Sequence, residues 1–373
     1  MNSEFYEKEV PVLSREDAIA ILNTPDEELD VLIDRAKSLR YRYKGNRVSI
    51  HILTNARSGN CSQDCAYCAQ SCRSTADIDK YKWVDEDKLY QDNDFVNEYH
   101  LSRHCIGLSG MKFTDEEIEE LARRIRKMKE QGTHLCCSIG FLTEKQARML
   151  REAGLDRINH NLNSSRSYYH NICSTHTFEQ RVQNIRMLQG IGFEICSGGI
   201  IGMGESKEDV VDMLLELREI QPEALPINFL LPIKGTPLGD ADISMLTTEY
   251  CMKVLCLARL LVPKADIRCA AGRDRQTAFR IDRRGCGQTF SIYIERAPRH
   301  AAAAKAMGQK HLSWETGAGL VRRGVNGGLK SDSQLVERIL RALQKSAVRL
   351  LTHLPEHGRA EPGCHQREDH GTE

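Results

Sequence analysis

Three cysteines stand close together in the first quarter of the chain, at Cys61, Cys65 and Cys68. Three thiolates at this spacing can hold three irons of a four-iron, four-sulfur (4Fe–4S) cluster and leave the fourth iron open to a small molecule. An open iron indicates catalysis, beyond the storage of an electron. The spacing therefore predicts a catalytic iron–sulfur centre.

Two other metal sites fit part of this pattern. A zinc site usually shows paired CxxC elements, and the chain contains no second CxxC. Cys72 extends the run and could close the fourth coordination position, which would make the cluster a plain electron carrier. We favour the open cluster and interpret Cys72 as a bystander.

Tyr67, directly before the third cysteine, completes the motif CxxxCxYC. This motif resembles the signature of radical S-adenosylmethionine (SAM) enzymes. The resemblance implies that Cys61, Cys65 and Cys68 hold a catalytic 4Fe–4S cluster that binds SAM, with Tyr67 in the cofactor-binding site.

Strand-like and helix-like segments alternate from about residue 48 to 273 and must position these residues. The alternation predicts an α/β fold with a parallel sheet, and at this length a TIM-type (β/α)8 barrel. The active site of such a barrel lies at the carboxyl ends of its strands. The strand-like segments are 48–55, 102–110, 133–140, 156–163, 193–205, 224–233 and 266–273. The helix-like segments are 114–132, 143–154, 177–192, 206–221 and 247–263.

Side chains alternate between the two faces of a strand. The helix-covered outer face of a barrel should be apolar, so apolar positions mark that face and their neighbours point inward. By this test Cys105, Cys136, Cys196 and Arg268 converge inside the barrel from four strands. The test also directs inward Gly107, His134, Ser138, Asn159, Asn161, Asn163 and Asn228.

Three thiols and one arginine inside one barrel favour a second metal site. A single buried cysteine is usually a small core hydrophobe, whereas buried arginine is rare without a partner. Thiolates suit iron and sulfide, and a two-iron, two-sulfur (2Fe–2S) cluster is the natural size for four ligands. We therefore predict Cys105, Cys136 and Cys196 as thiolate ligands, with Arg268 either compensating their charge or ligating iron.

Five longer segments resemble biotin synthase, in the order in which that family carries them. The resemblance covers about residues 12 to 273, and the two cysteine sets match the two cluster sites of the family. Hydrogenase-maturation and methylornithine-forming relatives share the barrel but generally lack the full second set. The segments are 55–71 (NARSGNCSQDCAYCAQS), 158–172 (INHNLNSSRSYYHNI), 194–206 (EICSGGIIGMGES), 226–238 (PINFLLPIKGTPL) and 267–273 (IRCAAGR).

The resemblance implies a sulfurtransferase of the radical SAM class that inserts sulfur into dethiobiotin to form biotin. One electron from the 4Fe–4S cluster would cleave SAM to methionine and a 5′-deoxyadenosyl radical, which abstracts hydrogen from the substrate. The 2Fe–2S cluster would then donate the sulfur. The cofactors carry the difficult chemistry, while the protein supplies position and exclusion of water.

Residues 198–205 (GGIIGMGE) resemble the family segment that contacts the adenine of SAM. The match assigns Gly199, Ile200, Gly202 and Glu205 to cofactor binding, and glycines permit close approach of the backbone.

Three asparagines complete the implied site. Asn161 and Asn228 match substrate-binding positions, and an amide that both donates and accepts suits the cyclic urea of dethiobiotin. Asn163 stands where an acidic residue often meets the ribose of SAM. Asparagine can still hydrogen-bond there, so Asn163 is assigned to cofactor binding.

After residue 273 the resemblance to the family stops. Only residues 289–294 (TFSIYI) are strand-like, near the expected place of the eighth strand, and residues 331–351 predict a helix. One hypothesis is a frameshift, because codons for residues 289–294 shifted by one base can spell HSLFT, which looks like the missing strand. Translation of the nucleotide sequence in all frames tests this hypothesis.

The chain is therefore expected to have three regions. Residues 1–45 predict two amphipathic helices that cap the bottom of the barrel, and residues 46–273 predict the radical SAM barrel. Residues 274–373 form an atypical tail, frameshifted or disordered.

Composition limits which binding partners and which cellular compartment are expected for this chain. The 52 Lys and Arg balance the 52 Asp and Glu, so no excess charge points to nucleic acid or anionic lipid. Hydrophobic residues make up 40%, but no apolar run could cross a membrane. Fourteen cysteines, with an N-terminus unlike a secretory signal, indicate a reducing, cytoplasmic location. The resemblance adds a flavodoxin or ferredoxin electron donor and a homodimer.

Two other functions stay open. A radical SAM relative acting on a different small substrate would not cleave SAM in response to dethiobiotin. An inactive iron–sulfur paralogue would cleave no SAM and would need four cysteines, including Cys72, for its first cluster.

Overall fold

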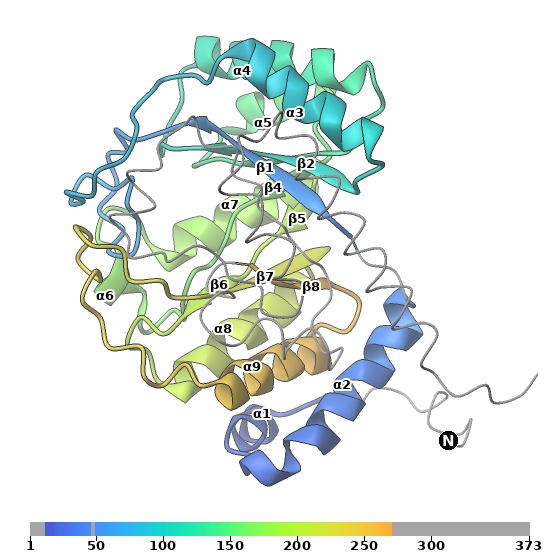
Figure 1. Ribbon diagram of the computed structural model, residues 1–373, viewed down its shortest axis with the longest axis vertical. Coiled ribbons are helices and arrows are strands. Elements are labelled where there is room, and N and C mark those ends of the chain that lie inside the picture. Colours follow the sequence, from blue (N-terminus) through green and yellow to red (C-terminus); the bar gives the residue numbers. More distant parts are fainter. Residues whose placement is uncertain (1–11, 46–48, 271–373) are drawn as a thin grey trace, which may run out of the picture. The chain divides into compact units, whose positions relative to one another are not determined.

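The computed structural model describes residues 12–45 and 49–270, all of which belong to one compact unit of the chain (Figure 1). The predicted tail at 274–373, with its strand at 289–294 and its helix at 331–351, lies outside the described residues.

The described strands form a single parallel sheet. They are β1 (His51–Arg57), β2 (Arg103–Leu108), β3 (Leu135–Ser138), β4 (Arg157–Asn159), β5 (Glu194–Cys196), β6 (Gly199–Ile201), β7 (Ala224–Phe229) and β8 (Asp266–Cys269). Their order is β1-β2-β3-β4-β5-β7-β6, and β8 pairs with β7. Both β5 and β6 pair with β7, so they are two halves of one interrupted strand. Each predicted strand-like segment overlaps an observed strand or, at 193–205, this interrupted pair; β1 extends two residues past the predicted end at residue 55.

Helices connect the strands and cover the outer face of the sheet (Figure 1). They are α1 (Arg15–Leu22), the 3-10 helix η2 (Asp26–Glu28), α2 (Leu29–Lys44), α3 (Glu86–Glu98), α4 (Asp115–Lys129), α5 (Glu144–Glu152), α6 (Tyr169–Ile172), α7 (Phe178–Gly190), α8 (Lys207–Ile220) and α9 (Thr248–Leu261). Capping boxes begin α1, α4, α5, α7 and α8, because a Ser or Thr side chain accepts from the third helical N–H and the third side chain accepts in return. The five helix-like segments predicted between strands are confirmed.

Helix α3 was not predicted, because its sequence is rich in Asp, Asn and Glu. Polar contacts hold it against the outer face of the first two strands. Thr54 on β1 donates to Asp92 on α3 over 2.7 Å and lies 2.8 Å from His104 on β2. Asp85 caps the helix at its start by accepting from the N–H of Asp87.

The two faces of the sheet carry different side chains. Outward residues such as Ile106, Leu135 and Ile195 are fully buried in the large core shared with the helices. Cys136, Cys196 and Ala224 form a separate buried cluster against which Cys105 packs. The parity test is therefore confirmed for the faces of these strands. His134 differs, since it is exposed at the amino end of β3.

The sheet curls far enough for its first and last described strands to meet. Arg268 on β8 places Nη2 3.1 Å from Nε2 of His51 on β1, although β1 and β8 share no backbone pairing among the described residues. The side chains between these two strands consequently face a common interior.

Helices α1 and α2 pack against α8 and α9 on the outside of the sheet (Figure 1). Lys44 at the end of α2 pairs with Asp266 at the amino end of β8. The predicted N-terminal helices are therefore present, and they cover outer helices. Helix α9 is buried along its length because it lies between the sheet and α2.

Candidate active site

The CxxxCxYC loop follows the carboxyl end of β1, where the barrel geometry predicts the active site. Its backbone is anchored on two other loops. The N–H of Ala66 donates to the carbonyl of Ile172 over 2.9 Å, and the carbonyl of Ala66 accepts from Leu238 over 3.1 Å. Such anchoring fixes where the three thiols point before any ligand binds.

The three thiols of this loop differ in exposure. Cys65 is buried, whereas Cys61 and Cys68 are half-buried. Burial raises the pKa of Cys68, and Cys61 adds to the rise because two anions would repel. Cluster binding must therefore displace protons from these thiols, as it does at metal sites generally. Cys72, which follows these three in the sequence, is exposed.

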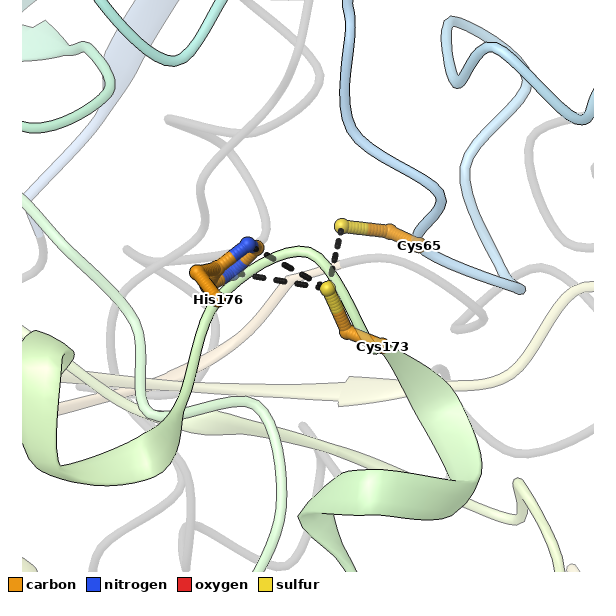
Figure 2. A group of neighbouring side chains, drawn as sticks. All are labelled: Cys65, Cys173 and His176. Atoms are coloured by element: carbon orange, nitrogen blue, oxygen red, sulfur yellow. Dashed lines mark hydrogen bonds between the residues drawn. The ribbon is translucent and has the colours of Figure 1, made fainter.

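Cys65 faces a fourth thiol that sequence analysis did not single out (Figure 2). Its Sγ lies 3.9 Å from Sγ of Cys173, which follows α6. The hydrogen bond to Cys173 and burial both raise the pKa of Cys65 as a free thiol. Cys173 Sγ also lies 3.2 Å from Nδ1 of His176 and 3.2 Å from Oδ1 of Asp64.

Cys65, Cys173 and His176 bring three possible ligand atoms within 4.8 Å of one another (Figure 2). The hydrogen bonds nevertheless disfavour a separate cation here. Arg181 can only donate, and its Nη2 lies 2.8 Å from Nε2 of His176, so the ring hydrogen is on Nδ1. Nδ1 lies 2.8 Å from Oε1 of Gln63 and also contacts Cys173, so its hydrogen points toward them. Neither ring nitrogen of His176 therefore has a lone pair left for a metal. The group is therefore a pair of thiols with a donor beside it.

The second cysteine set lies inside the curled sheet. Cys105 and Cys136 are register partners on β2 and β3, so their side chains stand next to each other on the inner face. Cys196 on β5 is 2% exposed and its Sγ accepts from Nδ2 of Asn159 over 3.1 Å. Cys136, and then Arg268, lower the pKa of Cys105 against the effect of burial. The hydrogen bond to Cys105 raises the pKa of Cys136, and burial raises the pKa of Cys196, so among the three free thiols only Cys105 is favoured as a thiolate.

Arg268 closes this set from β8. It is 3% exposed, its Nη2 lies 3.1 Å from Nε2 of His51, and its buried Nε has no hydrogen-bond partner among the described residues. A buried donor without a partner is costly and indicates a missing acceptor. Three thiols with this donor fit a 2Fe–2S cluster, whose sulfides and thiolates are acceptors.

His51 is a further member of the site that the sequence analysis did not identify. Because Arg268 can only donate, Nε2 of His51 accepts and the ring hydrogen is on Nδ1, 3.7 Å from Sγ of Cys105. Burial, and then Arg268, hold the pKa of His51 well below its usual value, so the ring is neutral. A signal was present, since Ile50 and Ile52 mark the outer face of this strand and direct His51 inward.

Two more arginines add positive charge close to the interior thiols. Arg103 on β2 and Arg157 on β4 both donate to Oε2 of Glu194, over 2.9 and 2.8 Å. Two arginines share one carboxylate, so a net positive charge is left beside the buried sulfurs. This charge suits an anionic cluster.

The segment predicted to bind SAM forms β6 and the turn after it. A Cβ at Gly199 would lie 2.1 Å from Sδ of Met213, so the methionine side chain would have to move to admit a larger residue there. Glu205 accepts from the N–H groups of Gly202 and Met203 over 2.6 and 2.8 Å. Both carboxylate oxygens are therefore used to hold the turn, and burial raises the pKa of Glu205. Ile200 is half-buried.

The three predicted asparagines lie beside this segment. Oδ1 of Asn161 accepts from the N–H of Gly198 over 3.2 Å, and Nδ2 of Asn228 donates to the carbonyl of Gly199 over 3.2 Å. Asn163 has a positive φ of 72° and pairs with the same strand, its carbonyl accepting from Ile200 over 2.8 Å. Asparagine tolerates this backbone conformation better than most residues.

A chain of polar contacts joins the two cysteine sets. Arg181 on α7 is its centre, because one guanidinium nitrogen contacts His176 and the other donates to the carbonyl of Asn161 over 3.1 Å. The chain is Cys65–Cys173–His176–Arg181–Asn161–Asn159–Cys196. A continuous series of contacts therefore connects the two sets.

Sequence profiles of two families match the chain. The radical SAM superfamily matches residues 56–217, and the Biotin and Thiamin Synthesis associated domain matches residues 226–281. The second match continues past residue 273, where the motif resemblance ends. Among the described residues, none of the helices has the length and apolar character needed to span a bilayer.

Curated relatives agree with these profiles. The chain is 41% identical over 263 residues to biotin synthase of Geobacillus kaustophilus, covering 70% of this chain and 78% of the relative. It is 40% identical to biotin synthase of Halalkalibacterium halodurans over the same shares of the two chains.

Solved structures share the fold. Methylornithine synthase superposes with a TM-score of 0.63 at 19% identity, over 77% of this chain and 85% of that chain. The FeFe-hydrogenase maturase of Carboxydothermus hydrogenoformans gives 0.64 at 16% identity, over 77% and 69%. At these identities the likeness concerns the fold alone.

Proposed function

This chain belongs to the biotin synthase family of radical SAM enzymes. From this we propose that it converts dethiobiotin to biotin and that each of its two cysteine sets holds one of the two clusters the reaction needs. Cys61, Cys65 and Cys68 would hold the 4Fe–4S cluster. The interior set, Cys105, Cys136, Cys196 and Arg268, would hold the 2Fe–2S cluster.

The convergence of the interior set carries the proposal. Radical SAM enzymes as a class need only the first three cysteines, so that set alone leaves the substrate open. Cys105, Cys136 and Cys196 face one interior from three strands, and within the described part of the chain the buried Nε of Arg268 has no hydrogen-bond partner. Three thiols beside a buried arginine suit an anionic, sulfur-rich group, because the thiolates can bind iron and the arginine can donate to sulfide.

When bound, the 4Fe–4S cluster supplies the electron that cleaves SAM to a 5′-deoxyadenosyl radical, and the 2Fe–2S cluster supplies the sulfur. The chain positions both. The turn that Glu205 holds by hydrogen bonds would place backbone groups against SAM. Asn161 and Asn228, beside this turn, would hydrogen-bond the urea ring of dethiobiotin. His51 places a donor near the sulfur of Cys105, and Arg268 places a positive charge beside Cys105 and Cys196.

We also propose a homodimer, a flavodoxin or ferredoxin as electron donor, and a reducing, cytoplasmic setting. The twelve cysteines in the described part of the chain are all free thiols, which supports a reducing compartment. The reaction begins with one-electron reduction of the 4Fe–4S cluster, so it requires a one-electron donor such as flavodoxin or ferredoxin. Size-exclusion chromatography with light scattering tests the dimer.

Anaerobic reconstitution with iron and sulfide, followed by SAM, reductant and dethiobiotin, tests the function. We expect biotin and two clusters per chain, and no SAM cleavage in response to other small cyclic amides. Adjacent cysteines provide a matched control, since Cys136 faces the interior and Cys137 the outer core. Cys136→Ala should lose the two-iron cluster, while Cys137→Ala keeps it. Two loaded clusters without biotin would refute the proposal.

A further inference from the structure

Cys65 and Cys173 form a buried thiol pair that the proposed function leaves unexplained. Cys65 follows β1 and Cys173 follows α6, so residues 108 positions apart in the sequence place their sulfurs 3.9 Å from each other. Figure 2 shows the two side chains reaching toward one another from separate loops. They are 8% and 5% exposed.

The surroundings keep this pair in place. The carbonyl of Ile172 accepts from the N–H of Ala66, which ties the two loops together directly beside the two thiols. Asp64 Oδ1 accepts from the N–H groups of Ser174 and Thr175 over 3.0 and 3.2 Å, a second tie between the same loops. The loops are thus bound on both sides of the pair, so the sulfurs cannot easily separate.

We propose that Cys65 and Cys173 form a reversible disulfide whenever Cys65 is not bound to iron. A disulfide needs the sulfurs about 2.05 Å apart, so they must approach by about 1.9 Å from the 3.9 Å seen here. Rotation of the two side chains can supply this movement without separating the loops.

Hydrogen peroxide is a sufficient oxidant. The thiolate of one cysteine attacks the peroxide, takes one oxygen as a sulfenic acid and releases hydroxide. The sulfur of the other cysteine then attacks the sulfenic sulfur, forming the S–S bond and expelling the second oxygen as water. Two thiols and one peroxide thus yield one disulfide and two waters, with two electrons passed to the peroxide.

The bond would protect a predicted cluster ligand. Sulfenic acid can oxidise further to sulfinic acid, which reductants do not restore, whereas a disulfide returns to thiols. Cys173 would therefore preserve Cys65 between loss and renewal of the cluster. This consequence rests on the proposed function, but the disulfide itself does not.

Peptide mapping of the full-length chain tests the bond. Protein stripped of iron is treated with one equivalent of peroxide, its free thiols are alkylated, and the digest is analysed by mass spectrometry. We expect the Cys65–Cys173 linkage in the wild type and in Cys72→Ser, which removes an exposed nearby thiol. The linkage should be absent from Cys173→Ser and disappear on reduction. Linkage of Cys65 to Cys61 or Cys68, or full alkylation of Cys173, would overturn the proposal.

Iron uptake tests the consequence separately. After a limited excess of peroxide and then dithiothreitol, the wild type and Cys72→Ser should regain several-fold more uptake than Cys173→Ser, in which Cys65 is also over-oxidised. Circular dichroism confirms that the variant is folded, and Cys173→Ala replaces it if it is not. Equal recovery in all proteins would overturn the protective role. Failure of untreated wild type to bind a cluster would instead refute the proposed function.

Discussion

At the scale of single residues, the site depends on which side of a strand each sulfur faces. Cys136 and Cys137 are neighbours in sequence, yet one faces the interior beside Cys105 and the other the apolar core. Arg268 and the neutral His51 then place a positive charge and a hydrogen-bond donor beside Cys105. Position on the strand, more than residue type, separates a candidate ligand from a core residue.

His51 provides a residue-scale prediction. His51→Ala should weaken retention of the interior cluster about 10-fold, because it removes the contacts to Arg268 and Cys105. His51→Asn keeps a donor near the place of Nδ1 and should retain most of the cluster. The measurement is the rate of iron loss to a chelator, followed by the visible absorption of the cluster. Equal rates for wild type and His51→Ala would contradict the assignment.

Much of the interior set was predictable because strand alternation is a local rule that a sequence displays directly. Cys105, Cys136, Cys196 and Arg268 follow from the apolar residues beside them. Cys173 could not be found this way, because it lies in a loop without periodicity. Its proximity to Cys65 arises only when the loop after β1 meets the segment after α6 in the folded chain.

At the scale of elements, close backbone packing fixes the turn between β5 and β6. A Cβ at Gly198 would lie 1.8 Å from the carbonyl oxygen of Pro226 on β7. The three nearest atoms are the backbone and ring of Pro226, which cannot yield as a flexible side chain could, so the interrupted strand requires glycine at this position. Packing against β7 therefore fixes the position of the turn that is predicted to bind SAM.

Gly198→Ala should accordingly destabilise the protein by about 3 kcal/mol or more. Gly190 in α7 is the matched control, because nothing lies within 4 Å of a Cβ there. Gly190→Ala should leave stability unchanged or raise it by up to about 1 kcal/mol. Urea denaturation followed by circular dichroism measures both, and similar losses in the two variants would argue against the packing at β7.

A helix cap gives a second prediction at this scale. Thr143 accepts from the N–H of Gln146, whose side chain accepts from the N–H of Thr143. Thr143→Ala should cost about 1 kcal/mol of unfolding free energy, and Thr143→Ser should restore most of it. An unchanged denaturation midpoint in the alanine variant would show that the cap contributes nothing.

At the scale of the whole molecule, the sheet brings chemistry from distant parts of the chain to one interior. His51 and Arg268, 217 positions apart, meet across it. Arg181 and the asparagines connect that interior to the CxxxCxYC loop. The described residues therefore contain every predicted ligand, while residues 274–373 lie outside them.

Buried histidine makes global stability depend on pH. Burial, and then Arg181, hold the pKa of His160 well below its usual 6.5, so the folded chain keeps the ring neutral while the unfolded chain protonates it. Stability should therefore be full above pH 6.5 and fall below it, by up to about 2 kcal/mol near about pH 5. His160→Phe should reduce this slope by about one proton in denaturation at several pH values. An unchanged slope would rule out His160 as its source.

The division of tasks between the two cysteine sets is tested most directly by measuring 5′-deoxyadenosine and biotin in the same anaerobic reactions. The wild type should form both products from SAM and dethiobiotin. Cys65→Ala should form neither, with a loss of at least about 100-fold. Cys136→Ala should still release 5′-deoxyadenosine but no biotin, because the radical is made without a sulfur to meet it. Biotin from Cys136→Ala, or 5′-deoxyadenosine from Cys65→Ala, would contradict the account.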